Sequence, residues 1–91
     1  MPLKPAYTGR FKRDVKVMQR RGFDMQKLKV LMGLLIEQQP LDPRHRDHPL
    51  SGPWNGHRDC HVEPDWVLIY RIILDENEIR FERTGTHSGL F

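Results

Sequence analysis

Apolar residues near the N-terminus recur with the period of an α-helix. Phe11, Val15 and Met18 fall at positions i, i+4 and i+7, so they would share one face of a helix while charged residues occupy the others. Thr8 precedes this stretch and is a suitable N-cap, and Gly22 follows it as a C′ residue would. The pattern predicts a helix between them.

A second helical pattern starts after Asp24, another suitable N-cap. We expect about fifteen residues of helix, closed by Pro40. Its apolar stripe is broad and consists of Leu28, Leu31, Met32, Leu35 and Ile36. Because the connection between the two helices is short, they should form an antiparallel hairpin, with the second helix lying across a sheet.

Shorter patterns, typical of β-strands, fill most of the remaining chain. The candidates are residues 3–7, 54–62, 66–74 and 79–84. The segment 66–74 is apolar on both faces, as a central strand should be. A strand, two helices and a three- or four-stranded meander predict an α+β fold with the helices packed on one face of the sheet.

Alternation along the strands assigns side chains to faces. Within residues 54–62, one face would carry His57, Asp59 and His61, and the opposite face Arg58, Cys60 and Val62. Within residues 79–84, one face would carry Ile79, Phe81 and Arg83. The buried side is the expected place for the cysteine, which would then be a packed thiol and not a nucleophile.

Pairing of the last two strands would gather polar residues from distant parts of the chain. Asp65 and Trp66 at the start of one strand would lie near Arg83 and His87 at the end of the other. The preceding loop, residues 41–53, is long and rich in histidine and arginine, which favours a functional role for it as well.

Charge and size narrow the classes of function. The 91 residues should form one domain, 1–91, and the formal net charge is +3. Most of the Lys and Arg residues lie between Lys4 and Lys29, where Asp14 and Asp24 are the only acids. This half could face a nucleic acid or an acidic protein. It could equally be a solvated pair of helices.

The chain carries no sign of secretion or membrane insertion. Cys60 is its single cysteine, which excludes an intramolecular disulfide and fits a reducing compartment. The N-terminus lacks an apolar signal region, and no segment approaches about eighteen apolar residues. We therefore expect a cytoplasmic, soluble protein without a membrane partner.

Five histidines in the second half raise the question of chemistry. A metal site is disfavoured because His57 and His61, four residues apart on a strand, would be about 13 Å apart. Metal-free RNA cleavage instead needs a base for the 2′-hydroxyl, an acid for the leaving 5′-oxygen and a cation for the phosphorane. Histidine and arginine suit these tasks. Solvated histidines without a catalytic role are the alternative.

Three segments of the second half resemble the YafQ toxins of the RelE/ParE superfamily. They read Arg46-x-His48-Pro-Leu-x-Gly52, then Trp54-x-Gly56-x-Arg58-Asp59-x-His61-Val-x-Pro64-Asp65-Trp66-x-Leu68-x-Tyr70, and finally Arg83-x-Gly85-x-His87. The likeness extends over essentially the whole chain. It implies a microbial-RNase-like fold, in which a small antiparallel sheet packs against two helices.

The resemblance also implies an activity and a set of residues. Such toxins are ribosome-dependent endoribonucleases that cut translated mRNA in the decoding site of the 70S ribosome, without a cofactor. The matching positions are His48, His61, Asp65, Arg83, His87 and Phe91, with Trp66 nearby. We assign His87 as general acid, Arg83 as the cation and Phe91 as the group that positions a nucleotide. The base stays open among Asp65, His61 and His48. Trp66 is expected to bind substrate as well, with either Trp66 or Phe91 stacking on a splayed base.

Partners follow from the same resemblance. The toxin would be inhibited by a cognate antitoxin of the DinJ or RelB type, which also binds operator DNA. Contacts to rRNA or to the antitoxin are expected from Lys12, Arg13, Lys16, Arg20 and Lys27.

Two other functions remain in competition. A ParE-like toxin that poisons gyrase without catalysis would share the fold, but it needs no combination of histidines and arginine. A non-enzymatic RNA-binding module would need only the basic helices and exposed aromatic residues.

Overall fold

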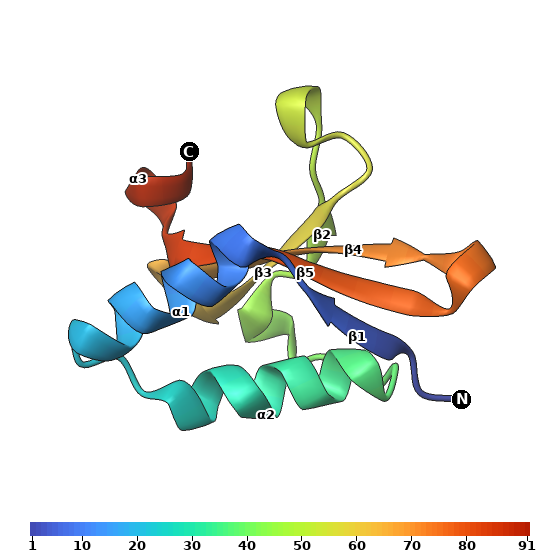
Figure 1. Cartoon of the computed structure of the whole chain (residues 1–91), viewed down its shortest axis with the longest axis horizontal. Coiled ribbons are helices and arrows are strands. Elements are labelled where there is room, and N and C mark those ends of the chain that lie inside the picture. Colours follow the sequence, from blue (N-terminus) through green and yellow to red (C-terminus); the bar gives the residue numbers. More distant parts are fainter.

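The computed structural model describes the whole chain, residues 1–91, as a five-stranded sheet with three helices (Figure 1). The strands are β1 (Lys4–Tyr7), β2 (His48–Pro49), β3 (Arg58–Glu63), β4 (Trp66–Ile73) and β5 (Glu78–Thr86). The helices are α1 (Gly9–Arg20), α2 (Met25–Ile36) and α3 (His87–Leu90). Short 3-10 turns are η1 (Pro43–His45), η2 (Gly52–Trp54) and η3 (Leu74–Glu76). The predicted α+β class is confirmed.

Both long helices begin where the sequence places their caps. The Thr8 hydroxyl accepts a hydrogen bond from the Phe11 N–H at 3.0 Å, and the Asp24 carboxylate accepts one from the Gln26 N–H at 2.9 Å. Gly22 has a φ of +87°, as a residue that ends a helix often does. No helix is long and apolar enough to cross a membrane.

The second helix is shorter than expected. It ends at Ile36 after twelve residues, four residues before Pro40. The chain leaves the helix through Gln38, which adopts a left-handed φ of +57°. Pro40 therefore lies beyond the helix end and does not itself terminate it.

The sheet is mixed, with the strand order β1-β5-β4-β3-β2. The strands from β2 to β5 pair antiparallel, whereas β1 pairs parallel to β5, with Tyr7 opposite Phe81. The expected antiparallel sheet is therefore correct for the meander and wrong for its edge. The direction of β1 depends on where the helical hairpin returns the chain, which strand patterns alone do not reveal.

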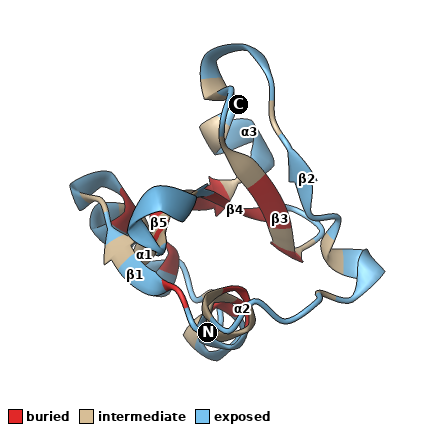
Figure 2. Cartoon of the chain, turned by 90° about the vertical axis from the view of Figure 1, so that its right-hand side faces the viewer, coloured by how far each residue is buried: buried red, intermediate tan, exposed pale blue.

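A core forms between α2, α1 and one face of the sheet. Trp66, Leu68 and Tyr70 of β4 are almost completely buried there, together with Phe11, Met18, Leu28, Leu31 and Phe81. Figure 2 shows the buried positions concentrated in the central strands and on the side of α2 that faces them. The loop around η2 and helix α3 rise from the opposite side of the sheet (Figure 1). That opposite side is called the outer face below.

A β-bulge in β5 changes the face on which one residue lies. Ile69 pairs with Arg83, but its neighbour Tyr70 pairs with Phe81, so Glu82 is an extra residue in β5. Phe81 points into the core, whereas Arg83 shares the outer face with Ile69. The expectation that Phe81 and Arg83 share a face is wrong, because the bulge shifts the alternation by one residue.

The third strand is also shorter than predicted. It begins at Arg58, not at Trp54. Gly52 and Gly56 have left-handed φ values of +63° and +88°, and they shape the turn that precedes the strand. The alternation predicted for the rest of the strand is confirmed, since Cys60 and Val62 belong to the core.

Candidate active site

One row of residues crosses four strands on the outer face. His48 of β2 pairs with Asp59 of β3, Asp59 pairs with Ile69 of β4, and Ile69 pairs with Arg83 of β5. Residues directly opposite one another in a ladder point to the same side of the sheet. The row therefore brings a histidine, a carboxylate and an arginine onto one surface.

A second row lies two residues along from the first. It contains His61 of β3, Val67 of β4 and Gly85 of β5. His87 follows at the end of β5, where α3 begins. The predicted approach of the start of β4, with Asp65 and Trp66, to the end of β5 thus has a structural basis in the register, which pairs Trp66 with Thr86. The same register places His61 near this end of β5.

The short helix α3 folds back over the end of the sheet. The Asp65 carboxylate accepts a hydrogen bond from the His87 N–H at 3.4 Å. Leu90 packs so closely over Gly85 that a Cβ at this glycine would lie 3.4 Å from the leucine side chain. The His87 and Phe91 rings are 4.9 Å apart, and Phe91 is half exposed. An imidazole and an accessible aromatic ring therefore lie side by side.

The histidines in β2 and β3 have a defined orientation. Nδ1 of His48 lies 2.6 Å from the Arg46 carbonyl oxygen, and Nδ1 of His61 lies 3.0 Å from the Pro64 carbonyl oxygen. A carbonyl oxygen can only accept, so Nδ1 must carry the hydrogen in both rings. In the neutral form each ring then keeps a lone pair on Nε2.

Asp59 is a buried carboxylate among these histidines. Its exposed fraction is 2%, and its Oδ1 lies 3.2 Å from Nδ1 of His48 without a well-aligned hydrogen bond. Burial raises the pKa of Asp59, while the charges of His48, His61 and His87 act in the opposite direction. His48 is the imidazole that lies directly beside this carboxylate.

Arg83 is held by a residue of α1. The Asp14 carboxylate accepts hydrogen bonds from Nε of Arg83 at 2.6 Å and from Nη2 at 3.1 Å. This hydrogen-bonded carboxylate raises the pKa of the guanidinium, which stays charged throughout the range in which histidines titrate.

Trp66 does not belong to the exposed site. Its exposed fraction is 0%, its ring contacts Phe23 in the core, and its Nε1–H donates to the Thr84 hydroxyl at 2.9 Å. The expectation that Trp66 lies against RNA is wrong, because the side chain faces the helices and not the outer face. Its role is to hold β4 against β5.

Sequence reasoning missed two acidic residues. Asp59 was placed on the correct face but was given no function, although a carboxylate between two histidines on one strand face is itself a signal. Asp14 lies three residues after Phe11 and one before Val15, so it interrupts the apolar stripe of α1. A charge at such a position indicates a specific partner in the fold.

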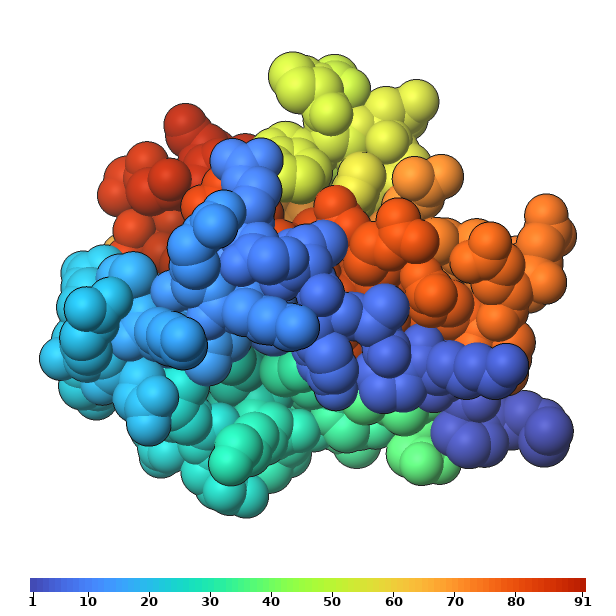
Figure 3. Space-filling view, in the orientation of Figure 1, coloured from blue at the N-terminus to red at the C-terminus, as the bar shows by residue number.

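The basic residues of α1 lie on the surface. Lys12, Arg13, Lys16 and Arg20 are all exposed, and Figure 3 shows α1, in blue and cyan, facing the viewer without cover from another element. Lys27 of α2 is different, because its amine donates to Glu63 at 2.7 Å. This hydrogen bond raises the pKa of Lys27.

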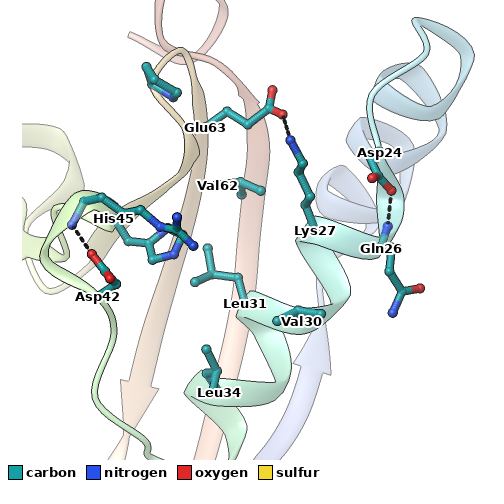
Figure 4. A pocket seen from close by; sticks show the side chains of 12 residues that line it. Asp24, Gln26, Lys27, Val30, Leu31, Leu34, Asp42, His45, Val62 and Glu63 are labelled. Atoms are coloured by element: carbon teal, nitrogen blue, oxygen red, sulfur yellow. Dashed lines mark hydrogen bonds and ion pairs between the residues drawn. The ribbon is translucent and has the colours of Figure 1, made fainter.

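The Lys27–Glu63 contact spans a hollow between α2, η1 and the end of β3 (Figure 4). Apolar side chains of α2 and β3, namely Val30, Leu31, Leu34 and Val62, line part of it. Its lining contains none of His48, Asp59, His61, Arg83 or His87. The hollow is therefore separate from the candidate active site.

Comparison with known proteins shows the family to which the chain belongs. The model of the family described as "Bacterial toxin of type II toxin-antitoxin system, YafQ" matches residues 3–91. The mRNA interferase toxin YafQ of Escherichia coli strain K12 is 56% identical over 86 residues, which cover 93% of this chain and 91% of that protein. The chain belongs to the YafQ family of bacterial toxins of type II toxin–antitoxin systems.

Solved structures of relatives have the same fold. The crystal structure of YafQ from Escherichia coli strain BL21(DE3) has a TM-score of 0.90 and 52% identity, with 98% of each chain covered. The toxin in the Escherichia coli DinJ–YafQ toxin–antitoxin complex has a TM-score of 0.88 and 52% identity, with 100% of this chain and 99% of that chain covered.

Proposed function

We propose that this chain is an mRNA interferase, a ribosome-dependent endoribonuclease that cleaves translated mRNA when its antitoxin is absent. Its membership in the YafQ family and the name of the 56% identical relative support the class of activity. The observation that carries the proposal is the arrangement of His48, Asp59, Arg83, His61 and His87 on one face of the sheet. A gyrase poison would not need this arrangement.

The chemistry is cleavage by the 2′-hydroxyl of the RNA itself. His48 or His61 acts as general base, because Nε2 of each neutral ring carries a free lone pair. Asp65 is a less suitable base, since its carboxylate already accepts the N–H at the start of α3. Its part is to hold α3 in place.

His87 acts as general acid toward the leaving 5′-oxygen, and Arg83 stabilises the charge of the phosphorane. Phe91 stacks on a base next to the scissile phosphate, because its half-exposed ring lies beside His87. Stacking of this kind holds a splayed nucleotide so that the acid reaches the oxygen atom it must protonate.

Docking on the ribosome uses the exposed basic residues of α1. Lys12, Arg13, Lys16 and Arg20 lie on one accessible helix and contact rRNA phosphates. Lys27 contributes less, because its ammonium is already paired with the Glu63 carboxylate. The site of action is the cytoplasm, where translating ribosomes are found.

The second partner is an antitoxin. A relative with 52% identity is seen in a complex with DinJ. We propose that a DinJ-like or RelB-like protein binds this chain, blocks its access to ribosomes and connects the pair to operator DNA. Charge favours an acidic or amphipathic segment of the antitoxin, given the net charge of +3 of the toxin.

The test is to map new RNA 5′ ends in a reconstituted translation reaction. The samples are the toxin, its His87→Ala variant, and the toxin with the same mRNA but no ribosomes. The proposal is supported if the mRNA is cut at fixed positions within codons, if these cuts require ribosomes, and if they disappear in the His87→Ala variant. Uninterrupted translation with intact mRNA contradicts it and directs attention to gyrase assays.

A further inference from the structure

The contact between Asp14 and Arg83 joins a basic helix to the candidate active site. Asp14 is one of two acidic residues in the basic stretch between Lys4 and Lys29. Its carboxylate accepts three hydrogen bonds, from Nε and Nη2 of Arg83 and from the Thr84 N–H at 3.2 Å. The Asp14–Arg83 contact has a defined geometry, because both carboxylate oxygens accept hydrogen bonds from one edge of the guanidinium.

The edge of the sheet explains why α1 supplies this carboxylate. Strand β1 ends at Tyr7, opposite Phe81, so the following part of β5 has a strand on its β4 side but none on the other side. The first turns of α1 take the place of a strand. The Thr8 hydroxyl donates to the Glu82 carbonyl at 2.9 Å, and Asp14 accepts from the Thr84 N–H. Backbone groups that would otherwise be unpaired are satisfied by this helix.

The bulge at Glu82 places Arg83 beside this carboxylate. The guanidinium has two hydrogen-bonding edges, one formed by Nε and Nη2 and the other by Nη1 and Nη2. Asp14 binds the first edge, and no protein group hydrogen-bonds to Nη1. The second edge therefore has no protein partner, and the Arg83 side chain is 19% exposed. Its geometry suits two oxygen atoms of a phosphate.

We propose that Asp14 is a positioning residue for cleavage, which holds the guanidinium of Arg83 so that its free edge receives the scissile phosphate. This inference rests on the proposed function, in which Arg83 stabilises the phosphorane. A long arginine side chain has many rotamers, and a bidentate carboxylate selects one of them before the substrate arrives. The pair is part of the site and also fastens α1 to β5.

A purely structural pair would have different consequences. Its loss would lower the free energy of unfolding but leave the cleavage rate of folded molecules unchanged. A positioning pair must change the rate constant at saturation, because the charge that stabilises the transition state is no longer fixed in place. Affinity for the ribosome would be retained, since α1 keeps its basic residues.

The experiment compares Asp14→Asn with a matched control, Glu78→Gln. Glu78 also binds an arginine of β5, since Nε and Nη2 of Arg80 donate to its carboxylate at 3.2 and 2.9 Å. Single-turnover cleavage of ribosome-bound mRNA is measured over a range of toxin concentrations. We expect Asp14→Asn to lower the rate at saturation by about 10- to 100-fold, with the half-saturating concentration within about two-fold of wild type. Glu78→Gln should match the wild type in both.

A double-mutant cycle shows whether Asp14 acts through Arg83. In an Arg83→Gln background, Asp14→Asn should cause no further loss, because the group that it positions is absent. Equal losses in both backgrounds would overturn the inference. So would an Asp14→Asn variant that is less stable in urea but cleaves at the wild-type rate when folded.

The same data separate this inference from the proposed function. If Arg83→Gln and His87→Ala both cleave normally, the proposed chemistry fails, and the positioning role fails with it. If these two variants are defective while Asp14→Asn is fully active, only the inference about Asp14 is overturned.

Discussion

Asp59 and Arg83 lie in one row across the sheet, separated by Ile69 of the central strand. With adjacent strands about 4.8 Å apart, their backbones are about 10 Å from each other. The carboxylate is buried beside His48, whereas the guanidinium lies on β5 against α1. Across this row the buried carboxylate thus lies toward β3, and the guanidinium, paired with Asp14, lies toward β5.

Replacement of Asp59 should make the protein more stable and less active. Asp59→Asn removes a buried charge that has no well-aligned hydrogen bond. We expect a gain in the free energy of unfolding near pH 7.5, measured as a higher Tm. Cleavage should fall by about 10-fold, less than the 10²–10⁴-fold typical of a direct proton donor. Urea denaturation and single-turnover cleavage measure the two effects.

The pH dependence of that gain follows from the direction of the pKa shift. The pKa of Asp59 is raised in the folded state, so the folded protein favours the protonated carboxyl. Wild type is therefore penalised as pH rises above the ordinary value of about 3.9 and through the raised pKa. The advantage of Asp59→Asn should be largest at neutral pH and vanish below about pH 4. An advantage that grew on acidification would contradict this account.

Phe91 should matter for cleavage and not for stability. The side chain is half exposed and contacts the His87 ring at a centroid distance of 4.9 Å. Phe91→Ala should change the free energy of unfolding by less than about 0.5 kcal/mol. It should slow cleavage by about 10-fold, which corresponds to the loss of one stacked base. Phe91→Trp, which keeps a stacking surface, should retain most of the activity.

Trp66 should show the opposite behaviour. Trp66→Phe leaves a small cavity and removes the hydrogen bond to the Thr84 hydroxyl. We expect a loss of about 1–3 kcal/mol in the free energy of unfolding. The rate constant of the folded fraction should stay within about two-fold of wild type. If a stably folded Trp66→Phe variant cleaved mRNA much more slowly than wild type, Trp66 would have to contact the substrate, which contradicts this prediction.

The basic surface of α1 should control binding and its dependence on salt. The double variant Lys16→Gln and Arg20→Gln removes two exposed charges from one side of the helix. Affinity for ribosomes should fall, and the slope of log affinity against log salt should decrease by about 1 for each lost phosphate contact. Cleavage at saturating toxin should be unchanged. An unaltered salt slope would show that these residues face only solvent.

Much of the fold follows from residues that act locally. Thr8 and Asp24 start their helices through hydrogen bonds within one turn, and Cys60 is buried because alternation places it opposite Asp59. The parallel pairing of β1 is a different matter, since Tyr7 and Phe81 are far apart in the sequence. Local patterns do not define the direction in which such segments meet.

In the candidate site, too, some features follow from local sequence and others depend on contacts between distant segments. Motif resemblance identifies the histidines, but the bulge at Glu82 decides that Arg83 faces them, and a bulge leaves no clear sign in the alternation. Trp66 was misplaced for a related reason, because a tryptophan near site residues suits either a core or a stacking surface. Asp14 and Arg83 are far apart in the sequence, and their contact depends on the packing of α1 along β5, which local patterns do not define.

The central claim is that the 2′-hydroxyl of the RNA is the nucleophile, activated from the outer face of this sheet. The most direct measurement uses a translated mRNA with a single 2′-deoxynucleotide on the 5′ side of the mapped cut. The account predicts that cleavage at this position disappears, while unmodified mRNA gives fragments with 2′,3′-cyclic phosphate and 5′-hydroxyl ends. Cleavage of the deoxy-substituted mRNA at the normal rate would contradict the account, because water would then be the nucleophile.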